Sequence, residues 1–362
     1  MGERIAGLAT ARVVGTGLLG TSIALGLRQH GVRVLLADPS PTALALAEDV
    51  GGGEPDPGGI AVDLVVVAAP PDVTADVVLT ELETHPDATV TDVASVKAGI
   101  AAAVAGAAGA AGAARYVGGH PMAGRERSGP VAAQADLFLG RPWVLCPSAL
   151  TDDGRLALVR RVVVALGAAP VQLDAAAHDE AVALVSHVPQ VAASLVSARL
   201  VKAADEAVAL AGQGLRDTTR IADSDPSLWA QILAANSGPV VRTLKDLRAD
   251  LDDVIGALES ASRAQATVAR VVESGRDGRA RIPGKHGGSP TRYAQVTVLL
   301  PDRPGQLRRL FDDIGEAGIN VEEFALEHAA GQLVGLAEVS VLPAARPALV
   351  EALTARDWRV VS

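Results

Sequence analysis

Residues 13–22, "VVGTGLLGTS", decide the fold of this chain. A short apolar strand, "ARVVG" (11–15), leads into the stretch, and a helix-length segment follows it. The glycines are spaced as GxGxxG. In such a turn the first glycine makes the tight bend, the second lets the backbone approach a pyrophosphate, and the third lets the helix pack on the strand. The stretch therefore predicts a dinucleotide-binding unit.

An acidic residue follows at the spacing that this unit requires. The second predicted strand (32–38) ends in Asp38, whose carboxylate can accept from ribose hydroxyls and repels a 2′-phosphate. We therefore expect NAD rather than NADP. The backbone of "AAPPDV" (68–73) is expected to line the cofactor as well. The expected cofactor-binding residues are Gly15, Thr16, Gly17, Leu18, Leu19, Gly20, Asp38, Ala69 and Pro70.

The strand pattern predicts an α/β fold with a mostly parallel sheet covered on both faces. From about residue 175 the pattern becomes helical, with later helical stretches around 226–238 and 239–274, and a small βαββαβ unit of α+β type begins at Tyr293. The predicted strands of the first part are 11–15, 32–38, 62–70, 88–95, 114–119, 142–147 and 169–174. The predicted domains are a Rossmann NAD-binding domain (10–175), an all-α domain (176–275), a flexible basic linker (276–292) and the α+β domain (293–362).

Composition limits the possible partners and compartment. A net charge of −10 argues against nucleic acid and anionic membranes as partners. No apolar run approaches the roughly 20 residues of a membrane span, and no signal peptide is recognisable. The single cysteine, Cys146, excludes an internal disulfide and is interpreted as a small buried hydrophobe. We expect a cytoplasmic protein without a metal site.

Two further stretches carry candidate chemistry. "DVASVKAGI" (92–100) and "GGHPMAGRE" (118–126) each follow a predicted strand, so Ser95, His120 and Glu126 should face one crevice. A dehydrogenase needs a base for the hydroxyl proton, and a neutral imidazole suits that role near pH 7. Taken alone, a histidine such as His120 is more often structural, and a serine such as Ser95 is more often a helix cap. His178, beside Asp179, is interpreted as structural.

Together with "LVSHVPQ" (184–190) and "GLRDTTRIADSDPSLW" (214–229), these motifs resemble the prephenate/arogenate dehydrogenases of tyrosine biosynthesis. The resemblance covers about residues 10–275. It implies an NAD domain, a helical domain that forms a homodimer, and oxidative decarboxylation of prephenate to 4-hydroxyphenylpyruvate.

The same resemblance implies a role for each motif residue. His120 would accept the proton of the ring hydroxyl, and Ser95 would position that hydroxyl. Arg220 would bind the ring carboxylate. The residues implied around the rest of the substrate are His187 and Ser186 at the side chain, Glu126 and Asp217 in an ionic network with Arg220, and Trp229 close by.

The last unit, with "VLLPDRPGQLRRLFDDIGEAGINVEEF" (298–324), resembles the ACT domain, which usually binds an amino acid. The resemblance implies a regulatory module that senses tyrosine, or alternatively a dimerisation module without ligand. The residues implied to face the effector are Asp302, Arg303, Pro304, Gly305, Gly318, Ile319 and Asn320.

Three alternatives stay open at this point. The substrate could be arogenate, whose side chain carries an ammonium group. A dehydrogenase of small 3-hydroxy acids would need a helical-domain lysine, and only Lys202 and Lys245 are present there, neither in a suitable motif. A non-enzymatic sensor of NAD and an amino acid is the third, and the complete set of Ser95, His120 and Arg220 argues against it.

Overall fold

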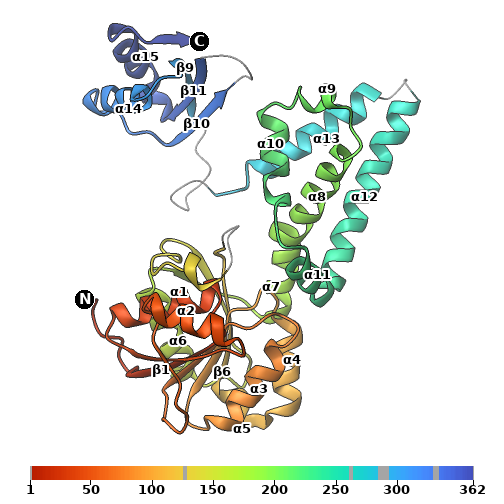
Figure 1. Ribbon diagram of the computed structural model, residues 1–362. Helices are drawn as coiled ribbons and strands as arrows, with labels where there is room; N and C mark the ends of the chain where they lie inside the picture. The colour runs from red at the N-terminus through yellow and green to blue at the C-terminus, as the bar shows by residue number, and fades with distance from the viewer. Residues whose placement is uncertain (1, 125–128, 261–263, 284–292, 329–333, 362) are drawn as a thin grey trace. The chain divides into compact units, whose positions relative to one another are not determined.

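The computed structural model describes the chain except for residues 1, 125–128, 261–263, 284–292, 329–333 and 362 (Figure 1). By internal contacts it divides into two compact units. The first comprises residues 1–201 and 219–246, and the second comprises residues 202–218 and 247–362. The predicted all-α domain is therefore shared between the two units.

The first unit contains an eight-stranded sheet in the order β3-β2-β1-β4-β5-β6-β7-β8. Neighbouring strands are parallel except β6 and β7. All seven predicted strands are present, and the two-residue edge strand β3 was not predicted. The bounds are β1 Thr10–Val14, β2 Arg33–Ala37, β3 Glu54–Pro55, β4 Leu64–Val67, β5 Thr89–Asp92, β6 Tyr116–Pro121, β7 Pro142–Cys146 and β8 Ala169–Gln172.

Helices cover both faces of this sheet, as the continuous apolar strands predict (Figure 1). Ile23 and Leu27 pack in one core with Val13 of β1, whereas Val78 and Ile100 pack in another with strand residues of the opposite face. The first core involves α1 Leu18–Gln29, α2 Pro41–Asp49 and α6 Asp153–Ala165; the second involves α3 Thr74–Thr84, α4 Ala98–Ala107 and α5 Gly109–Arg115. A short 3₁₀ turn, Pro130–Ala132, lies in the loop before β7.

The sheet places a binding crevice where its strand order reverses. β1 pairs with β2 on one side and with β4 on the other, so the connections from β1 and β4 leave in opposite directions. In open α/β sheets, ligands bind at the carboxyl ends of the strands at such a point. Gly15 and Ala68 follow these two strands and therefore lie at the crevice.

One long helical run follows the sheet. It consists of α7 Ala175–Val182, a π-helical turn Ala183–His187 and α8 Val188–Leu200. Asp174 caps its start, since its side chain accepts from the N–H of Ala177 at 2.8 Å. α7 contacts α4 and β7, which brings the start of this run against the sheet. A 3₁₀ turn Arg220–Ala222, α11 Pro226–Ala235 and the first part of α12 Ser237–Glu259 complete the unit.

The expectation that no segment is long and apolar enough to span a membrane was wrong on length and composition. Among the described residues, the run Ala175–Leu200 is long and apolar enough to cross a membrane. Core helices of soluble proteins can be equally long and apolar, so these two properties do not distinguish a membrane span from a core helix. This run also contains the buried polar residues His178, Asp179, His187 and Gln190, which suit packing within a protein.

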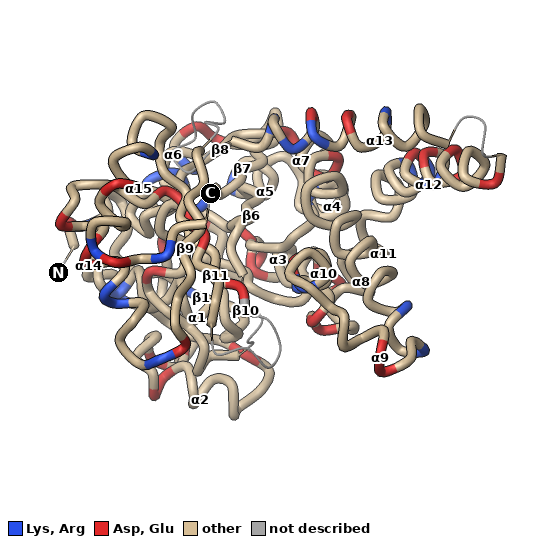
Figure 2. The backbone as a smooth tube through the Cα atoms, turned by 90° about the horizontal axis from the view of Figure 1, so that it is seen from above, with Lys and Arg blue, Asp and Glu red and all other residues tan. Residues whose placement is uncertain are grey.

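The second unit contains helices and the C-terminal module. The predicted helical stretch 239–274 is divided, because α12 ends at Glu259 and α13 spans Ala264–Arg279. α13 therefore continues through residues 276–279, the start of the predicted linker, and residues 284–292 lie outside the described part. Acidic and basic residues both occur along α13 (Figure 2). The short helices are α9 Asp205–Val208 and α10 Gln213–Thr219.

The C-terminal module has the predicted βαββαβ order. Its four-stranded antiparallel sheet has the order β10-β11-β9-β12, and Leu310, Ile314, Leu349 and Leu353 of its two helices pack on that sheet. Gly318 ends α14 with φ +69°. The bounds are β9 Ala294–Pro301, α14 Gln306–Glu316, β10 Glu323–His328, β11 Val334–Val341, a 3₁₀ turn Pro343–Ala345, α15 Arg346–Ala355 and β12 Arg359–Val361.

Candidate active site

The glycine-rich turn between β1 and α1 is fixed by close backbone contacts. Gly15 has φ +95°, and a Cβ there would lie 2.3 Å from the carbonyl oxygen of Ala68. A Cβ on Gly20 would lie 1.9 Å from the carbonyl oxygen of Gly15. Both positions therefore exclude any side chain, which is the tight packing that the spacing predicts.

Gly17 differs from these two glycines in facing open space. A Cβ built there would meet no described atom within 4 Å, and Gly17 is the N-cap of α1 without a side-chain capping bond from the described residues. The first N–H groups of a helix have no partner within it, so a phosphate can accept from them. A side chain at Gly17 would fill that space, so the turn fits the pyrophosphate of NAD.

The Asp38 carboxylate lies beside this turn. Its Oδ2 accepts from the N–H of Thr16 at 2.6 Å and from the Thr16 hydroxyl at 3.0 Å, and its Oδ1 accepts from the N–H of Ser40 at 2.8 Å. Asp38 thus connects β2 to the glycine turn. Each carboxylate oxygen can accept more than one hydrogen bond, so capacity remains for ribose hydroxyls.

The other expected cofactor residues are packed around the turn. Leu18 and Leu19 are partly buried against the core. The hydroxyl of Thr74 donates to the carbonyl oxygens of Ala69 and Pro70, at 3.1 and 2.8 Å. The side-chain hydroxyl thereby fixes the backbone that follows β4.

His120 lies in β6 and is almost completely buried. Its Nδ1 is 2.8 Å from Nε2 of His178, and the two rings meet edge to face with centroids 5.1 Å apart. Burial lowers the pKa of His120 well below its usual value, and His178, Lys97 and His187 lower it further. His120 is therefore a neutral imidazole at pH 7, as a general base requires.

His178 is connected in turn to Asp179. Its Nδ1 is 2.8 Å from Oδ1 of Asp179. That carboxylate also accepts from the backbone N–H groups of Lys97 and Ala98, at 2.8 and 2.9 Å. Burial favours a raised pKa for Asp179, but the hydrogen bonds from His178, Ala98 and Lys97 outweigh it and lower the pKa. Asp179, a residue of α7, is thus an ionised carboxylate that accepts from N–H groups at the start of α4.

A buried ion pair lies next to this chain of groups. Lys97, 1% exposed, pairs with the fully buried Asp92. Asp92 also accepts from the Tyr116 hydroxyl at 2.6 Å and from the N–H of Ala94 at 2.8 Å. Burial raises the pKa of Tyr116 well above its usual value, and the negative charge of Asp92 raises it further. Lys97 is therefore a paired cation close to the His120 ring.

His187 occupies the last position of the π-helical turn, a feature often found at functional sites. Its Nδ1 is 3.0 Å from Nδ2 of Asn236, which also donates to the carbonyl oxygen of Asp179 at 2.8 Å. Burial lowers the pKa of His187 to about 4. The ring of Trp229 packs edge to face against it, with centroids 6.0 Å apart.

Among the residues predicted around the substrate, the described contacts join His187 with Trp229. Ser95 is half-buried after β5, and no hydrogen bond joins it to His120 among the described residues. Ser186 is half-buried and Arg220 is exposed in the turn Arg220–Ala222. Asp217 belongs to the second unit, where it accepts from Gln213 at 2.8 Å. Glu126 lies outside the described residues, so the expected ionic network stays a prediction.

Comparisons with known proteins identify the family. Residues 23–172 match the family described as "Prephenate dehydrogenase, nucleotide-binding domain", and residues 174–270 match "Prephenate dehydrogenase, dimerization domain". The chain belongs to the prephenate dehydrogenase family. It is 39% identical over 358 residues to the "Probable prephenate dehydrogenase NovF" of Streptomyces niveus, covering 96% of this chain and 98% of that protein.

Solved structures of the family are also similar. Prephenate dehydrogenase from A. aeolicus, in complex with hydroxyphenyl propionate and NAD+, is 28% identical with a TM-score of 0.66, covering 75% of this chain and 98% of the other. Synechocystis arogenate dehydrogenase is also 28% identical, with a TM-score of 0.63 and coverage of 75% and 98%. These similarities show that the chain has a Rossmann domain and a helical domain. They also show that it is an oxidoreductase of this family that uses NAD.

Membership in the prephenate dehydrogenase family does not by itself reveal the partners of His120. The sequence interpretation of His178 as merely structural overlooked its contact with His120. Asp179, Lys97 and Asn236 were not assigned a role either. A signal was present in "HDE" (178–180), a histidine and a carboxylate at the start of a helix, but the partner lies 58 residues away in the chain.

Proposed function

We propose that this protein catalyses NAD-dependent oxidative decarboxylation of prephenate to 4-hydroxyphenylpyruvate. The observation that carries the proposal is His120: a buried neutral imidazole whose Nδ1 is occupied by His178, within the nucleotide-binding domain of this family. His120 lies in β6, and Gly15, Ala68 and Ser95 follow β1, β4 and β5. The carboxyl ends of these parallel strands lie on one edge of the sheet.

The chain's residues have a limited chemical task. Bound NAD supplies the acceptor for the hydride that leaves the carbinol carbon. His120 takes the hydroxyl proton as the C=O bond forms. The ring carboxylate then leaves as carbon dioxide, its bonding electrons make the ring aromatic, and the phenol oxygen takes back a proton. One base and correct positioning account for this sequence.

The remaining side chains are proposed to bind and orient the substrate. Ser95 orients the hydroxyl, and Arg220 binds the ring carboxylate through its planar guanidinium. His187, neutral through its lowered pKa, and Ser186 contact the side chain of the substrate. Trp229 lies against His187, and the ionic network of Glu126 and Asp217 with Arg220 stays a prediction from the family resemblance.

An absorbance assay of NADH formation tests the function directly. Purified protein is mixed with prephenate or arogenate, each with NAD and with NADP. We expect turnover with prephenate and NAD, and a loss of roughly 10²- to 10⁴-fold in His120→Asn, which retains NAD binding. Turnover of arogenate alone would favour the second candidate, which the similarity to Synechocystis arogenate dehydrogenase supports. NAD binding without turnover of either substrate would favour a sensor.

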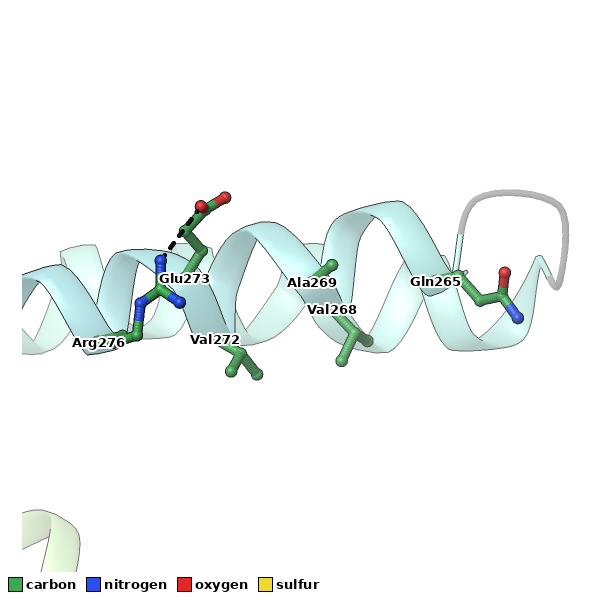
Figure 3. Close-up of a pocket in the computed structure, with 6 residues that line it drawn as sticks. All are labelled: Gln265, Val268, Ala269, Val272, Glu273 and Arg276. Atoms are coloured by element: carbon green, nitrogen blue, oxygen red, sulfur yellow. Dashed lines mark ion pairs between the residues drawn. The ribbon is translucent and has the colours of Figure 1, made fainter. Parts of the chain in front are cut away.

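We also propose a cytoplasmic homodimer assembled through the helical region. Exposed apolar side chains support it: Val185 is 63% exposed, Leu195 58% and Val272 66%. Figure 3 shows Val268 and Val272 on one side of α13, where they line a shallow hollow. Light scattering of the full chain should give twice 36.7 kDa. A monomer at micromolar concentration would contradict the proposal.

For the C-terminal module we propose an ACT domain that binds an amino-acid effector such as tyrosine. Its βαββαβ order supports this, and so does its presence in the aligned length, since coverage of 96% of the chain must include most of residues 293–362. Asp302, Arg303 and Asn320 are exposed, as are Pro304, Gly305 and Gly318, whereas Ile319 is half-buried. In the full chain, Asp302→Ala with Asn320→Ala should abolish inhibition by tyrosine while leaving uninhibited turnover intact. Unchanged inhibition would contradict the proposal.

A further inference from the structure

We propose that His178, itself oriented by the Asp179 carboxylate, fixes the ring tautomer of His120 so that Nε2 of His120 is the atom that accepts the substrate proton. His178 and Asp179 are then positioning residues for the reaction. The inference rests on the proposed function, because it specifies which atom of the base acts and what orients it. It is carried by two consecutive contacts, Asp179 with His178 and His178 with His120.

The first contact fixes the proton of His178. An ionised carboxylate only accepts hydrogen bonds, and Asp179 Oδ1 is 2.8 Å from His178 Nδ1. The same carboxylate accepts from two backbone N–H groups, which orient it and have no alternative role as acceptors. His178 therefore carries its proton on Nδ1.

The second contact transmits this choice to His120. With its proton on Nδ1, the His178 ring has its lone pair on Nε2, so that atom accepts. His120 Nδ1, 2.8 Å away, must then be the donor. The neutral His120 ring consequently has its lone pair on Nε2, the nitrogen that points away from His178 in the ring. The opposite tautomer would place two lone pairs against each other.

Burial strengthens the preference of His120 for the tautomer with its proton on Nδ1. His178 is fully buried and His120 is 9% exposed, so water cannot readily replace a missing acceptor at Nδ1. The charged and titratable groups around the pair are Lys97 and Asp92 next to α4, His187 on the π-helical turn, and Tyr116 and Cys146 on β6 and β7. When His120 takes a proton, its Nδ1–H still donates to His178, and the Asp179 carboxylate one ring away stabilises the new charge.

Substitution of His178 tests the inference by kinetics. His178→Phe keeps a planar ring but removes the acceptor, so we expect kcat to fall about 10- to 100-fold with KM changed less than about twofold. In His178→Gln the amide oxygen can accept from His120 Nδ1, so part of the lost kcat should return. Tyr116→Phe is the matched control, since it removes a buried hydrogen bond to Asp92 but leaves the chain to His120 intact. It should lower thermal stability without the loss of kcat.

Nitrogen-15 NMR of imidazole-labelled full-length protein tests the tautomer without substrate or cofactor. The His120 signals are assigned from the spectrum of His120→Asn. We expect a protonated Nδ1 and an unprotonated Nε2 in the native protein. The two variants should differ in the tautomer of His120. In His178→Phe the ring should gain the Nε2–H form that free histidine prefers, whereas in His178→Gln it should keep its proton on Nδ1.

Two results would overturn the inference. A proton on Nε2 of His120 in the native protein contradicts it directly, whether or not the variants fold. Native kcat in a folded His178→Phe variant contradicts the functional part. Failure of the protein to oxidise prephenate or arogenate would instead refute the proposed function, and the NMR result would still decide the tautomer.

Discussion

Gly15 and Ala68 lie so close that a Cβ on Gly15 would be 2.3 Å from the Ala68 carbonyl oxygen. This contact joins the ends of β1 and β4, the two strands between which the crevice lies. Gly17, two residues later, has no described atom within 4 Å of an added Cβ and a φ of −72°. The same chemical change at these two glycines should therefore have different consequences.

Gly15→Ala should destabilise the fold, and Gly17→Ala should impair cofactor binding alone. We expect Gly15→Ala to lower the free energy of unfolding by more than about 2 kcal/mol, because a positive φ and a backbone clash act together. Gly17→Ala should unfold like the native protein but bind NAD at least about tenfold more weakly. Urea unfolding and fluorescence titration with NADH measure the two effects. Equal stability of the two variants would contradict this interpretation of the turn.

Asp38 should determine the choice between NAD and NADP. Replacing Asp38 with Ser removes the negative charge that opposes a 2′-phosphate, so the preference for NAD over NADP should fall at least about tenfold. Thr16→Val is the control, since it removes only the hydroxyl donor at 3.0 Å and leaves the carboxylate. The ratio of kcat/KM values for the two cofactors is measured in each variant. An unchanged ratio in Asp38→Ser would remove Asp38 from cofactor selection.

The architecture followed from the sequence because its determinants are local. Continuous β-branched runs such as "VDLVVVAAP" (62–70) predict buried strands, and GxGxxG with Asp38 predicts a dinucleotide-binding turn after the first strand. The division between α12 and α13 was missed, because both segments have the same helical period. The two-residue strand β3 has no periodicity to detect.

The site was only partly predictable, because its chemistry depends on contacts distant in sequence. His120 was predicted from "GGHPMAG", but its contact with His178 arises from the packing of α7 against α4 and β7. In the sequence, Lys97 was only one residue of a motif. In the structure it is buried with Asp92, and its charge lowers the pKa of His120. Burial and partner identity are properties of the folded chain, and no spacing rule supplies them.

Arg220 should contribute to substrate affinity more than to turnover. Arg220→Lys keeps the charge but loses the planar pair of donors, so KM for prephenate should rise roughly 10-fold or more while kcat changes less. Arg242→Lys is the control, since Arg242 is an exposed residue that pairs with Glu180. Steady-state kinetics at saturating NAD separate the two parameters. A native KM in Arg220→Lys would refute the proposed carboxylate contact.

Lys97 should affect both stability and the pH dependence of activity. Lys97→Met leaves Asp92 without its buried cation, so the free energy of unfolding should fall by about 3–5 kcal/mol. The double variant Lys97→Met with Asp92→Asn should recover part of that stability. Lys97 also lowers the pKa of His120, so its removal should raise that pKa. His120 would then protonate at higher pH, and the acid limb of kcat/KM should move upward. An unmoved acid limb in a folded variant would show that Lys97 does not act on the base.

His187 should make the protein less stable as the pH falls from about 6.5 toward 4. Burial lowers the pKa of His187 to about 4 in the folded state, whereas an unfolded histidine titrates near 6.5. Above about pH 6.5 neither state binds the proton, so His187 does not make stability depend on pH there. Below it the unfolded chain takes up a proton that the folded chain refuses, and unfolding becomes more favourable until the folded state also protonates. His120 acts with the same sign, so His187→Gln should reduce the pH dependence without abolishing it. Urea unfolding at pH 7.5, 6 and 5 measures this, and an identical loss of stability in the native protein and His187→Gln would show that His187 is not the group responsible.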